Sequence, residues 1–327
     1  MVKNFQSSIT EKDEFPVLDK SGLEKFLLDG YDSELGWSRK PFTSGFEQGK
    51  YGTVMYKINE KGARFNPDYE YSPNKISVYG DSFAMSRQVN DEETIAHYLS
   101  ILTQTNVLNF GVGNYGIDQA FLRMKREYPK NKTDVVIQAF VPEQILRVVS
   151  YWKHYLEYGN HFGFKPRFKL ENDKLKLIPN IIDKKEKFNQ LVSLIPEIKK
   201  HDYWYERKFK KDFDKEYDFD QRMESNLEWR IKSYQDEECF KTLVGVIDLF
   251  VNNAKKEGFR PIVVVLPYKN DILFAKESFN YYNNFIQACS NKLITLDLMQ
   301  TFLNLDNLDL YFSDSTRYGG HYSKHGN

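Results

Sequence analysis

The chain has 327 residues, of which 41% are hydrophobic and 16% are aromatic, so it can bury a substantial globular core. Lysine plus arginine and aspartate plus glutamate each number 46, and this neutral balance gives no support for a nucleic-acid partner. No window approaches the roughly eighteen apolar residues of a membrane span, and the N-terminal stretch lacks the apolar region of a secretory signal, so we expect a cytoplasmic protein.

The two cysteines, Cys239 and Cys289, lie in segments with a helical pattern. They resemble neither a disulfide framework nor a spaced zinc site, and we expect two buried or unpaired thiols. No spacing of His, Asp and Glu predicts a metal site, and we expect no cofactor.

The N-terminal part of the chain, residues 1–74, is predicted to be an extension that packs on the core. One helix is expected around GLEKFLLDG. The segments that follow it are rich in Gly, Pro and aromatic residues, which is typical of extended segments and turns.

From Lys75 onward, short apolar runs alternate with longer amphipathic runs, which predicts an α/β domain over residues 75–327. The expected strands are KISVYG, NVLNFGV, DVVIQAFV, RPIVVVLP and KLITLDLM. Helices are expected between them, including residues 93–104, GIDQAFLRMKREY and a long helix that begins in PEQILRVV. We therefore predict a three-layer α/β/α, flavodoxin-like fold with a mostly parallel five-stranded sheet and right-handed connections.

The alternation is interrupted at residues 160–222, which are charged and aromatic. We interpret this segment as an insertion into the α/β domain. Within it, FKPRFKLENDKLKLIPN has the pattern of a β-hairpin.

Polar and glycine residues gather in the loops that follow three of the expected strands. These loops are GDSFAMS, GVGNYGIDQ and VPEQILR. Because ligands bind at the carboxyl ends of parallel strands, we expect any chemistry of this chain at that edge of the sheet.

Ser82 directly follows the first expected strand. A serine hydroxyl is a useful nucleophile only when a base takes its proton and donors hold the oxyanion. Alternatively, Asp81 or Ser82 only caps the next helix. The best candidate for the base is His321 in the final GGHYSKHGN, which follows two glycines on the same edge of the predicted sheet.

The order of GDSF, NFGVGNYG and the late histidine in GGHYSKHGN resembles the SGNH/GDSL hydrolase superfamily. More narrowly, the run from INEKGAR through VYGDSFAMSRQVNDEETIAHYL to DVVIQAF resembles bacterial SGNH-type proteins that are found beside polysaccharide-biosynthesis functions. The resemblance extends from about Leu35 to the end, apart from much of the insertion. It implies that Ser82 is the nucleophile and His321 the base. It also implies an oxyanion hole formed by the N–H of Ser82 and the turn at Gly113 and Asn114.

Two departures from the family pattern concern the supporting residues. The third block of the family carries Gly-x-Asn-Asp, whereas Glu143 and Gln144 occupy that place here, and Gln144 is the candidate replacement for the amide donor. The family has an acid three residues before the histidine, where this chain has Tyr318. Asp314 is the nearest replacement, and a Ser–His dyad supported by a backbone carbonyl is the alternative.

Family members also continue beyond the histidine block into a final helix that covers the sheet. This chain stops at Asn327, so we expect a truncated C-terminal helix and some exposed apolar sheet surface.

The resemblance implies a serine esterase or deacylase that removes an acyl group, above all acetyl, from a carbohydrate or a similar small ester. An O-acyltransferase would use the same residues. The two departures favour a different alternative, a catalytically weak SGNH-like binding or scaffold protein in polysaccharide biosynthesis. The sequence leaves the acyl group, the acceptor and the oligomeric state open.

Overall fold

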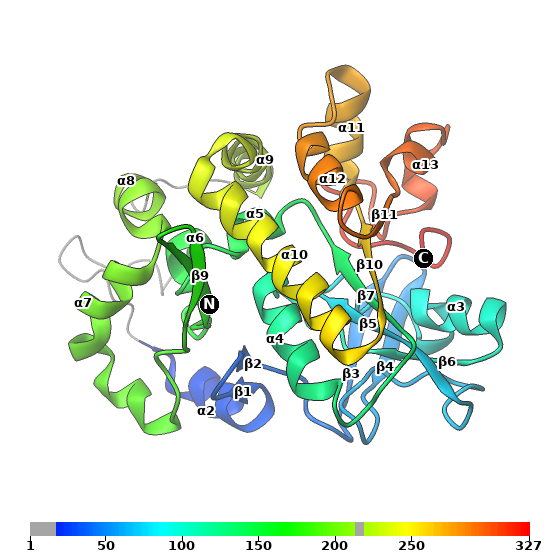
Figure 1. The fold of residues 1–327 in the computed structure, drawn as a ribbon, viewed down its shortest axis with the longest axis horizontal. Coiled ribbons are helices and arrows are strands. Elements are labelled where there is room, and N and C mark those ends of the chain that lie inside the picture. The colour runs from blue at the N-terminus through cyan, green and yellow to red at the C-terminus, as the bar shows by residue number, and fades with distance from the viewer. Residues whose placement is uncertain (1–17, 213–218) are drawn as a thin grey trace. The chain divides into compact units, whose positions relative to one another are not determined.

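The computed structural model describes residues 18–212 and 219–327, and Figure 1 shows their fold. The chain divides into two compact units. The described residues of one unit come from 1–38, 149–167 and 177–215, and those of the other come from 39–148, 168–176 and 216–327.

The expected N-terminal extension does not form one body. Residues 39–74 belong to the same unit as the sheet, whereas residues 18–38 belong to the other unit. Residues 1–17 of the expected extension lie outside the described residues.

The larger unit is built on one sheet of five parallel strands. In chain order these are β5 (Asn74–Gly80), β6 (Asn106–Asn109), β7 (Val135–Phe140), β10 (Arg260–Val265) and β11 (Ile294–Asp297). Their order across the sheet is β11-β10-β7-β5-β6, which is the flavodoxin-like arrangement of a doubly wound sheet. The predicted parallel five-stranded α/β fold is therefore confirmed.

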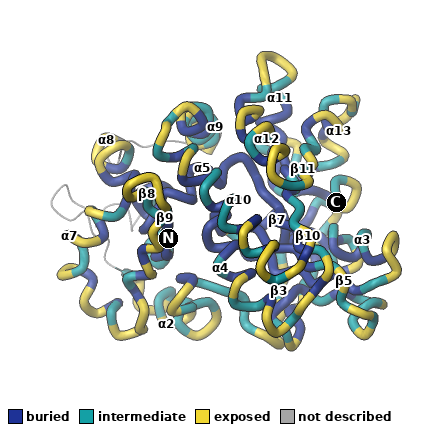
Figure 2. Tube along the Cα trace, in the orientation of Figure 1, coloured by how far each residue is buried: buried dark blue, intermediate teal, exposed yellow. Residues whose placement is uncertain are grey.

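The central strand β7 explains why this sheet forms from these residues. It is almost continuously apolar, and its residues Val136 and Phe140 are fully buried, as expected for a strand that is covered on both faces. Figure 2 shows this burial as dark blue along the central strands. At the edge strand β11, the apolar residues Ile294 and Leu296 are 48% and 50% exposed.

Helices α4 (Ile117–Glu127), α10 (Glu237–Glu257) and α12 (Asn283–Ser290) contact one another in that order and form a layer on the sheet. In α10, Leu243, Val246 and Ile247 are fully buried at helical spacing. With right-handed connections, α3 (Ile95–Thr103) covers the opposite face beside β6.

The remaining elements of the larger unit are short, apart from one long helix. They are β3 (Ser44–Gly49), β4 (Gly52–Lys57), η1 (Asp91–Glu93), α5 (Gln144–Arg147), α9 (Phe219–Gln235), α11 (Lys269–Glu277), α13 (Met299–Leu303) and η4 (Leu308–Leu310). Cys239 and Cys289 are buried and no disulfide joins them, as predicted.

The smaller unit is mainly helical. Its elements are α2 (Lys20–Asp29), β1 (Tyr31–Asp32), β2 (Gly36–Trp37), α6 (Lys153–Leu156), η2 (Lys185–Gln190), α7 (Leu191–His201), the π-helix η3 (Tyr205–Phe209) and α8 (Lys210–Asp212). The predicted hairpin in the insertion is confirmed as β8 (Arg167–Glu171) and β9 (Lys174–Ile178), and most of it, residues 168–176, belongs to the larger unit. Asn172 and Asp173 form its turn, each with a positive φ, as a tight hairpin requires.

The long helix expected from Pro142 was wrong. The chain instead forms the two short helices α5 and α6. The carboxylate of Asp202 accepts the N–H groups of Tyr151 and Trp152 at 2.7 and 2.8 Å. These donors are therefore not available for helical hydrogen bonds.

No helix in the described part of the chain is both long and apolar enough to cross a membrane.

A buried arginine, Arg64, fixes the loop that follows β5. Its Nε lies 2.9 Å from Asp91 Oδ1, and its Nη atoms donate to the carbonyl oxygens of Met85, Ser86 and Val89. The Arg64 side chain is almost completely buried. One guanidinium therefore holds several backbone carbonyls of the loop together.

We predict that Arg64→Lys lowers the free energy of unfolding by about 2–4 kcal/mol, because an ammonium group cannot reach these acceptors together. Urea unfolding followed by circular dichroism measures this change. The exposed Arg260 supplies the control, and Arg260→Lys should change the free energy by less than about 0.5 kcal/mol. Equal effects of the two substitutions would contradict the role of Arg64 in holding the loop after β5.

Candidate active site

The turn after β5 presents Ser82 at the carboxyl end of the strand. Gly80 is required there because a Cβ atom would lie 2.3 Å from the carbonyl oxygen of Ala139. Asp81 is fully buried, and its Oδ1 accepts the N–H of Phe83 at 2.9 Å. The Ser82 hydroxyl makes no hydrogen bond with any residue that the structure describes. Asp81 thus makes the local turn contact, and the hydroxyl of Ser82 is not used as a cap.

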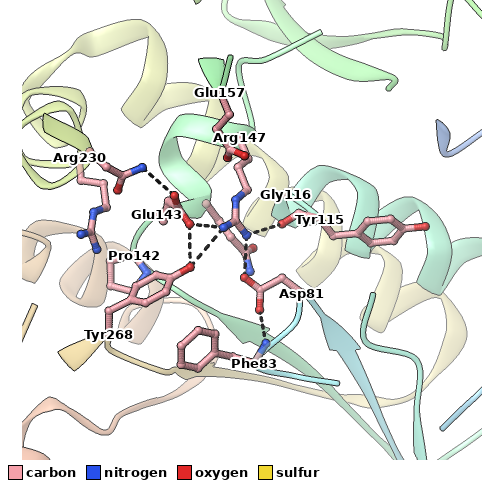
Figure 3. A network of polar contacts seen from close by, with 12 residues as sticks. Asp81, Phe83, Tyr115, Gly116, Pro142, Glu143, Arg147, Glu157, Arg230 and Tyr268 are labelled. Atoms are coloured by element: carbon pink, nitrogen blue, oxygen red, sulfur yellow. Dashed lines mark hydrogen bonds and ion pairs between the residues drawn. The ribbon is translucent and has the colours of Figure 1, made fainter. Parts of the chain in front are cut away.

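A buried arginine, Arg147, joins the loops that follow four of the parallel strands (Figure 3). Its Nη1 lies 2.8 Å from Asp81 Oδ2 and 3.2 Å from the carbonyl oxygen of Tyr115. Its Nη2 contacts Glu143 and lies 3.2 Å from the hydroxyl of Tyr268. These partners follow β5, β6, β7 and β10 respectively. The guanidinium therefore holds the turn before Ser82 to the rest of the sheet edge.

The charges of this network are partly compensated by neutral donors. Glu143 accepts the Tyr268 hydroxyl at 2.7 Å and the Asn226 amide at 2.7 Å. Burial raises the pKa of Asp81, and the nearby Arg147 opposes this change. Burial and the charge of Glu143 raise the pKa of Tyr268 well above its ordinary value, so this phenol stays protonated and donates.

The loop after β6 lies against the serine loop. A Cβ atom on Gly111 would lie 2.3 Å from the backbone nitrogen of Met85, so only glycine permits this approach. Asn114 is exposed and adopts the left-handed conformation with φ of 66°. Within the described part of the chain, the backbone N–H groups of Ser82 and Asn114 donate to no protein acceptor. Both are suitable donors for an oxyanion.

His321 lies next to the serine turn. Its ring centroid is 4.9 Å from that of Phe83, the residue after Ser82. Its Nδ1 lies 2.7 Å from Oε1 of Gln88. Burial, together with the charges of Arg87 and Arg147, lowers the pKa of His321 to about 3. In the described residues, no hydrogen bond joins Ser82 to His321.

Two of the expected supporting residues have other partners. The Asp314 carboxylate accepts the backbone N–H of Thr316 at 2.9 Å and also its hydroxyl, whereas Gln88 occupies the histidine Nδ1. The Gln144 side chain is fully buried, with Nε2 3.5 Å from the carbonyl oxygen of Ala139. The amide that we expected to face the oxyanion is therefore directed to the backbone of β7.

Sequence reasoning missed Arg147, Gln88 and Tyr268. The spacing of Glu143 and Arg147, four residues apart, is a signal that could have suggested an ion pair. Gln88 and Tyr268 lie in loops and carry no comparable signal. Tyr318, which stands where the family has an acid, packs on Tyr268, and the centroids of the two rings are 5.3 Å apart.

A metal ion is held by several side chains that are grouped together. Over residues 18–212 and 219–327, no three His, Cys, Asp or Glu side chains are grouped as a metal ion would need.

Comparisons with known proteins identify solved structures that this chain resembles. No protein-family model and no curated protein matches the sequence. A protein described as lipolytic, of the G-D-S-L family, from Desulfitobacterium hafniense is 15% identical with a TM-score of 0.37, covering 77% of this chain and 92% of that one. A member of the lipolytic G-D-S-L family from Veillonella parvula is 9% identical with a TM-score of 0.36, covering 77% and 91%. The SGNH-hydrolase family esterase AlinE4 is 11% identical with a TM-score of 0.36, covering 76% and 87%.

Proposed function

We propose that this chain is a serine hydrolase of the SGNH type with Ser82 as nucleophile and His321 as base. The observation that carries the proposal is the arrangement around Ser82. Its hydroxyl is not used in the fold, the N–H groups of Ser82 and Asn114 have no protein acceptor, and His321 packs on the neighbouring Phe83. The serine loop would therefore supply the nucleophile and one oxyanion donor, and two other loops would supply the second donor and the base.

The reaction follows from these positions. Ser82 Oγ attacks the ester carbonyl carbon while its proton passes to His321 Nε2, and the two N–H groups stabilise the negative oxygen. The intermediate collapses to an acyl-enzyme as Nε2 returns the proton to the leaving alcohol. Water then attacks the acyl-enzyme and gives a proton to Nε2. The second intermediate collapses as Nε2 returns this proton to Ser82 Oγ, which releases the acid and restores Ser82.

The proposed substrate is an acyl ester, above all an acetyl ester, of a carbohydrate or similar small molecule. This substrate class rests on the resemblance of the sequence motifs to polysaccharide-associated proteins. If a sugar hydroxyl takes the place of water in the second step, the same residues perform acyl transfer.

A second candidate function is a binding or scaffold protein of little catalytic power. It is favoured by the lack of a hydrogen bond between Ser82 and His321 in the described residues and by the direction of the Gln144 amide. Removal of a side-chain oxyanion donor costs about 10²–10³ in rate where it has been measured, which is the scale of the expected weakness.

We predict that Ser82→Ala lowers the turnover of p-nitrophenyl acetate by at least about 10³-fold, because the nucleophile is lost. A fluorophosphonate probe should label Ser82 in the wild type, and peptide mass spectrometry locates the modified residue. The matched control is Ser315→Ala, which removes an exposed serine from the same region. Full labelling of the Ser82→Ala protein would refute Ser82 as the nucleophile. No labelling of the folded wild type would refute the proposal in favour of the binding protein.

The oxyanion role of the Asn114 backbone is tested by a pair of substitutions. Glycine readily adopts the left-handed conformation found at Asn114, whereas a β-branched residue strains it. We predict that Asn114→Val lowers kcat by about 10²-fold with little change in KM, and that Asn114→Gly loses much less. Steady-state kinetics on p-nitrophenyl acetate measure both, and equal losses would argue against the backbone donor.

The lowered pKa of His321 predicts an unusual pH dependence. The ring loses its function as a base only when it is protonated, and its pKa of about 3 keeps it neutral as the pH falls from 7 to 5. We therefore expect kcat/KM to stay nearly constant over this interval, whereas a base of ordinary pKa would lose about 30-fold. The rate is followed at the isosbestic wavelength of nitrophenol. A decline that fits a pKa near 6.5 would disprove this expectation.

A further inference from the structure

We propose that Gln88 is the positioning residue of His321, so that an uncharged amide oxygen holds the imidazole in the place where hydrolases of this kind use a carboxylate. Gln88 lies in the serine loop, six positions after Ser82. The inference rests on the proposed function of Ser82 and His321, and it goes beyond it by naming how the base is oriented.

The contact between the two side chains determines the histidine tautomer. Gln88 Oε1 lies 2.7 Å from His321 Nδ1, and a carbonyl oxygen can only accept a hydrogen bond. Nδ1 must therefore carry the proton in the neutral ring. Nε2 is then left as the acceptor, which is the form that a general base for Ser82 needs.

The orientation of the Gln88 amide follows from its other partners. Oε1 also accepts the Ser313 hydroxyl at 2.9 Å and the backbone N–H of His321 at 3.1 Å. Nε2 of Gln88 donates to the carbonyl oxygen of Gln48 at 2.9 Å. Reversing the amide would place its NH₂ group against these donors and its oxygen against a carbonyl. The network therefore permits one orientation.

The backbone of Gln88 is held as firmly as its side chain. It has a φ of 66°, and its N–H donates to Glu47 at 3.1 Å. The carbonyl groups of Ser86 and Val89 on either side are held by the buried Arg64. A residue fixed in this way can orient a catalytic group without first losing conformational freedom.

The glycine before His321 is explained by the same contact. Gly320 has a φ of 64°, and a Cβ atom there would lie 2.1 Å from Ser313 Oγ and 3.3 Å from Gln88 Oε1. A side chain at this position would thus displace the Ser313 hydroxyl, which donates to Gln88 Oε1. The glycine in GGH therefore makes room for Ser313 and, through it, supports the Gln88 contact.

The charged groups around His321 determine how easily its ring is protonated, and the uncharged Gln88 adds no further charge to them. Arg87 and Arg147 disfavour the imidazolium, and Glu143 favours it. Arg87 is itself paired with Glu47, at 2.8 Å. Since Gln88 adds no charge, it fixes the tautomer but stabilises the protonated ring less than a carboxylate would.

The test uses ¹⁵N NMR of the histidine rings in the full chain, without substrate, with His321→Gln to assign the signal. We expect the wild type to show Nδ1 protonated and Nε2 unprotonated at neutral pH. In Gln88→Ala both tautomers should appear. In Gln88→Glu the tautomer should remain, while the pKa of His321 should rise by about one unit or more because a carboxylate faces Nδ1.

Kinetics supply the second measurement. Gln88→Ala should lower kcat by about tenfold or more with little change in KM, and Gln88→Glu should recover much of this loss at neutral pH while losing activity at a higher pH than the wild type does. The matched control is the exposed Gln287, where Gln287→Glu adds the same charge without these effects.

The outcomes separate this inference from the proposed function. A wild-type His321 protonated at Nε2, or a Gln88→Ala protein with an unchanged tautomer and kcat, would overturn the role of Gln88 even in an active enzyme. If Ser82 is not labelled but the NMR results are as expected, the hydrolase proposal fails while the contact that orients the ring stands.

Discussion

The ion pairs of Arg147 are the interaction on which the rest of this site depends. Parallel strands bring their carboxyl ends to one edge of the sheet. The loops beyond these ends, however, are not held together by the backbone hydrogen bonds that join the strands. Arg147 contacts groups that follow four strands, and one of these is Asp81, which precedes Ser82. The position of Ser82 is therefore coupled to the whole sheet edge and not only to its own turn.

This network is costly to bury and explains one departure from the family pattern. One guanidinium faces the two carboxylates of Asp81 and Glu143, and buried charges are stable only when their remaining polar atoms are satisfied. Asn226 and Tyr268 supply those hydrogen bonds to Glu143. The loop after β7 thus binds the Arg147 guanidinium through Glu143. In the proposed reaction, the oxyanion is therefore left to backbone N–H groups.

The sequence predicts those features that local pattern encodes. The apolar runs identify all five strands, and the glycines beside Ser82 and His321 indicate close backbone approaches. The predicted helix after Pro142 failed because Asp202, distant in sequence, takes the N–H groups of Tyr151 and Trp152. Asp314 was favoured for its proximity to His321 along the chain, but contacts across the fold decide which side chain reaches an imidazole.

The side chain that contacts the imidazole of His321 in the structure is Gln88 and not the expected Asp314, and the two differ in their chemistry. A carboxylate beside a catalytic histidine does two things: it selects the tautomer and it stabilises the imidazolium that forms during the reaction. The Gln88 oxygen, held by Ser313 and by the backbone of His321, does the first but brings no negative charge for the second. With Arg87 and Arg147 disfavouring the protonated ring, the imidazolium of the proposed reaction is more acidic than an ordinary one and returns its proton readily to the leaving group. In the proposed reaction, such a site relies more on the oxyanion donors than on the strength of its base, which is why the turn at Asn114 would matter there as much as His321.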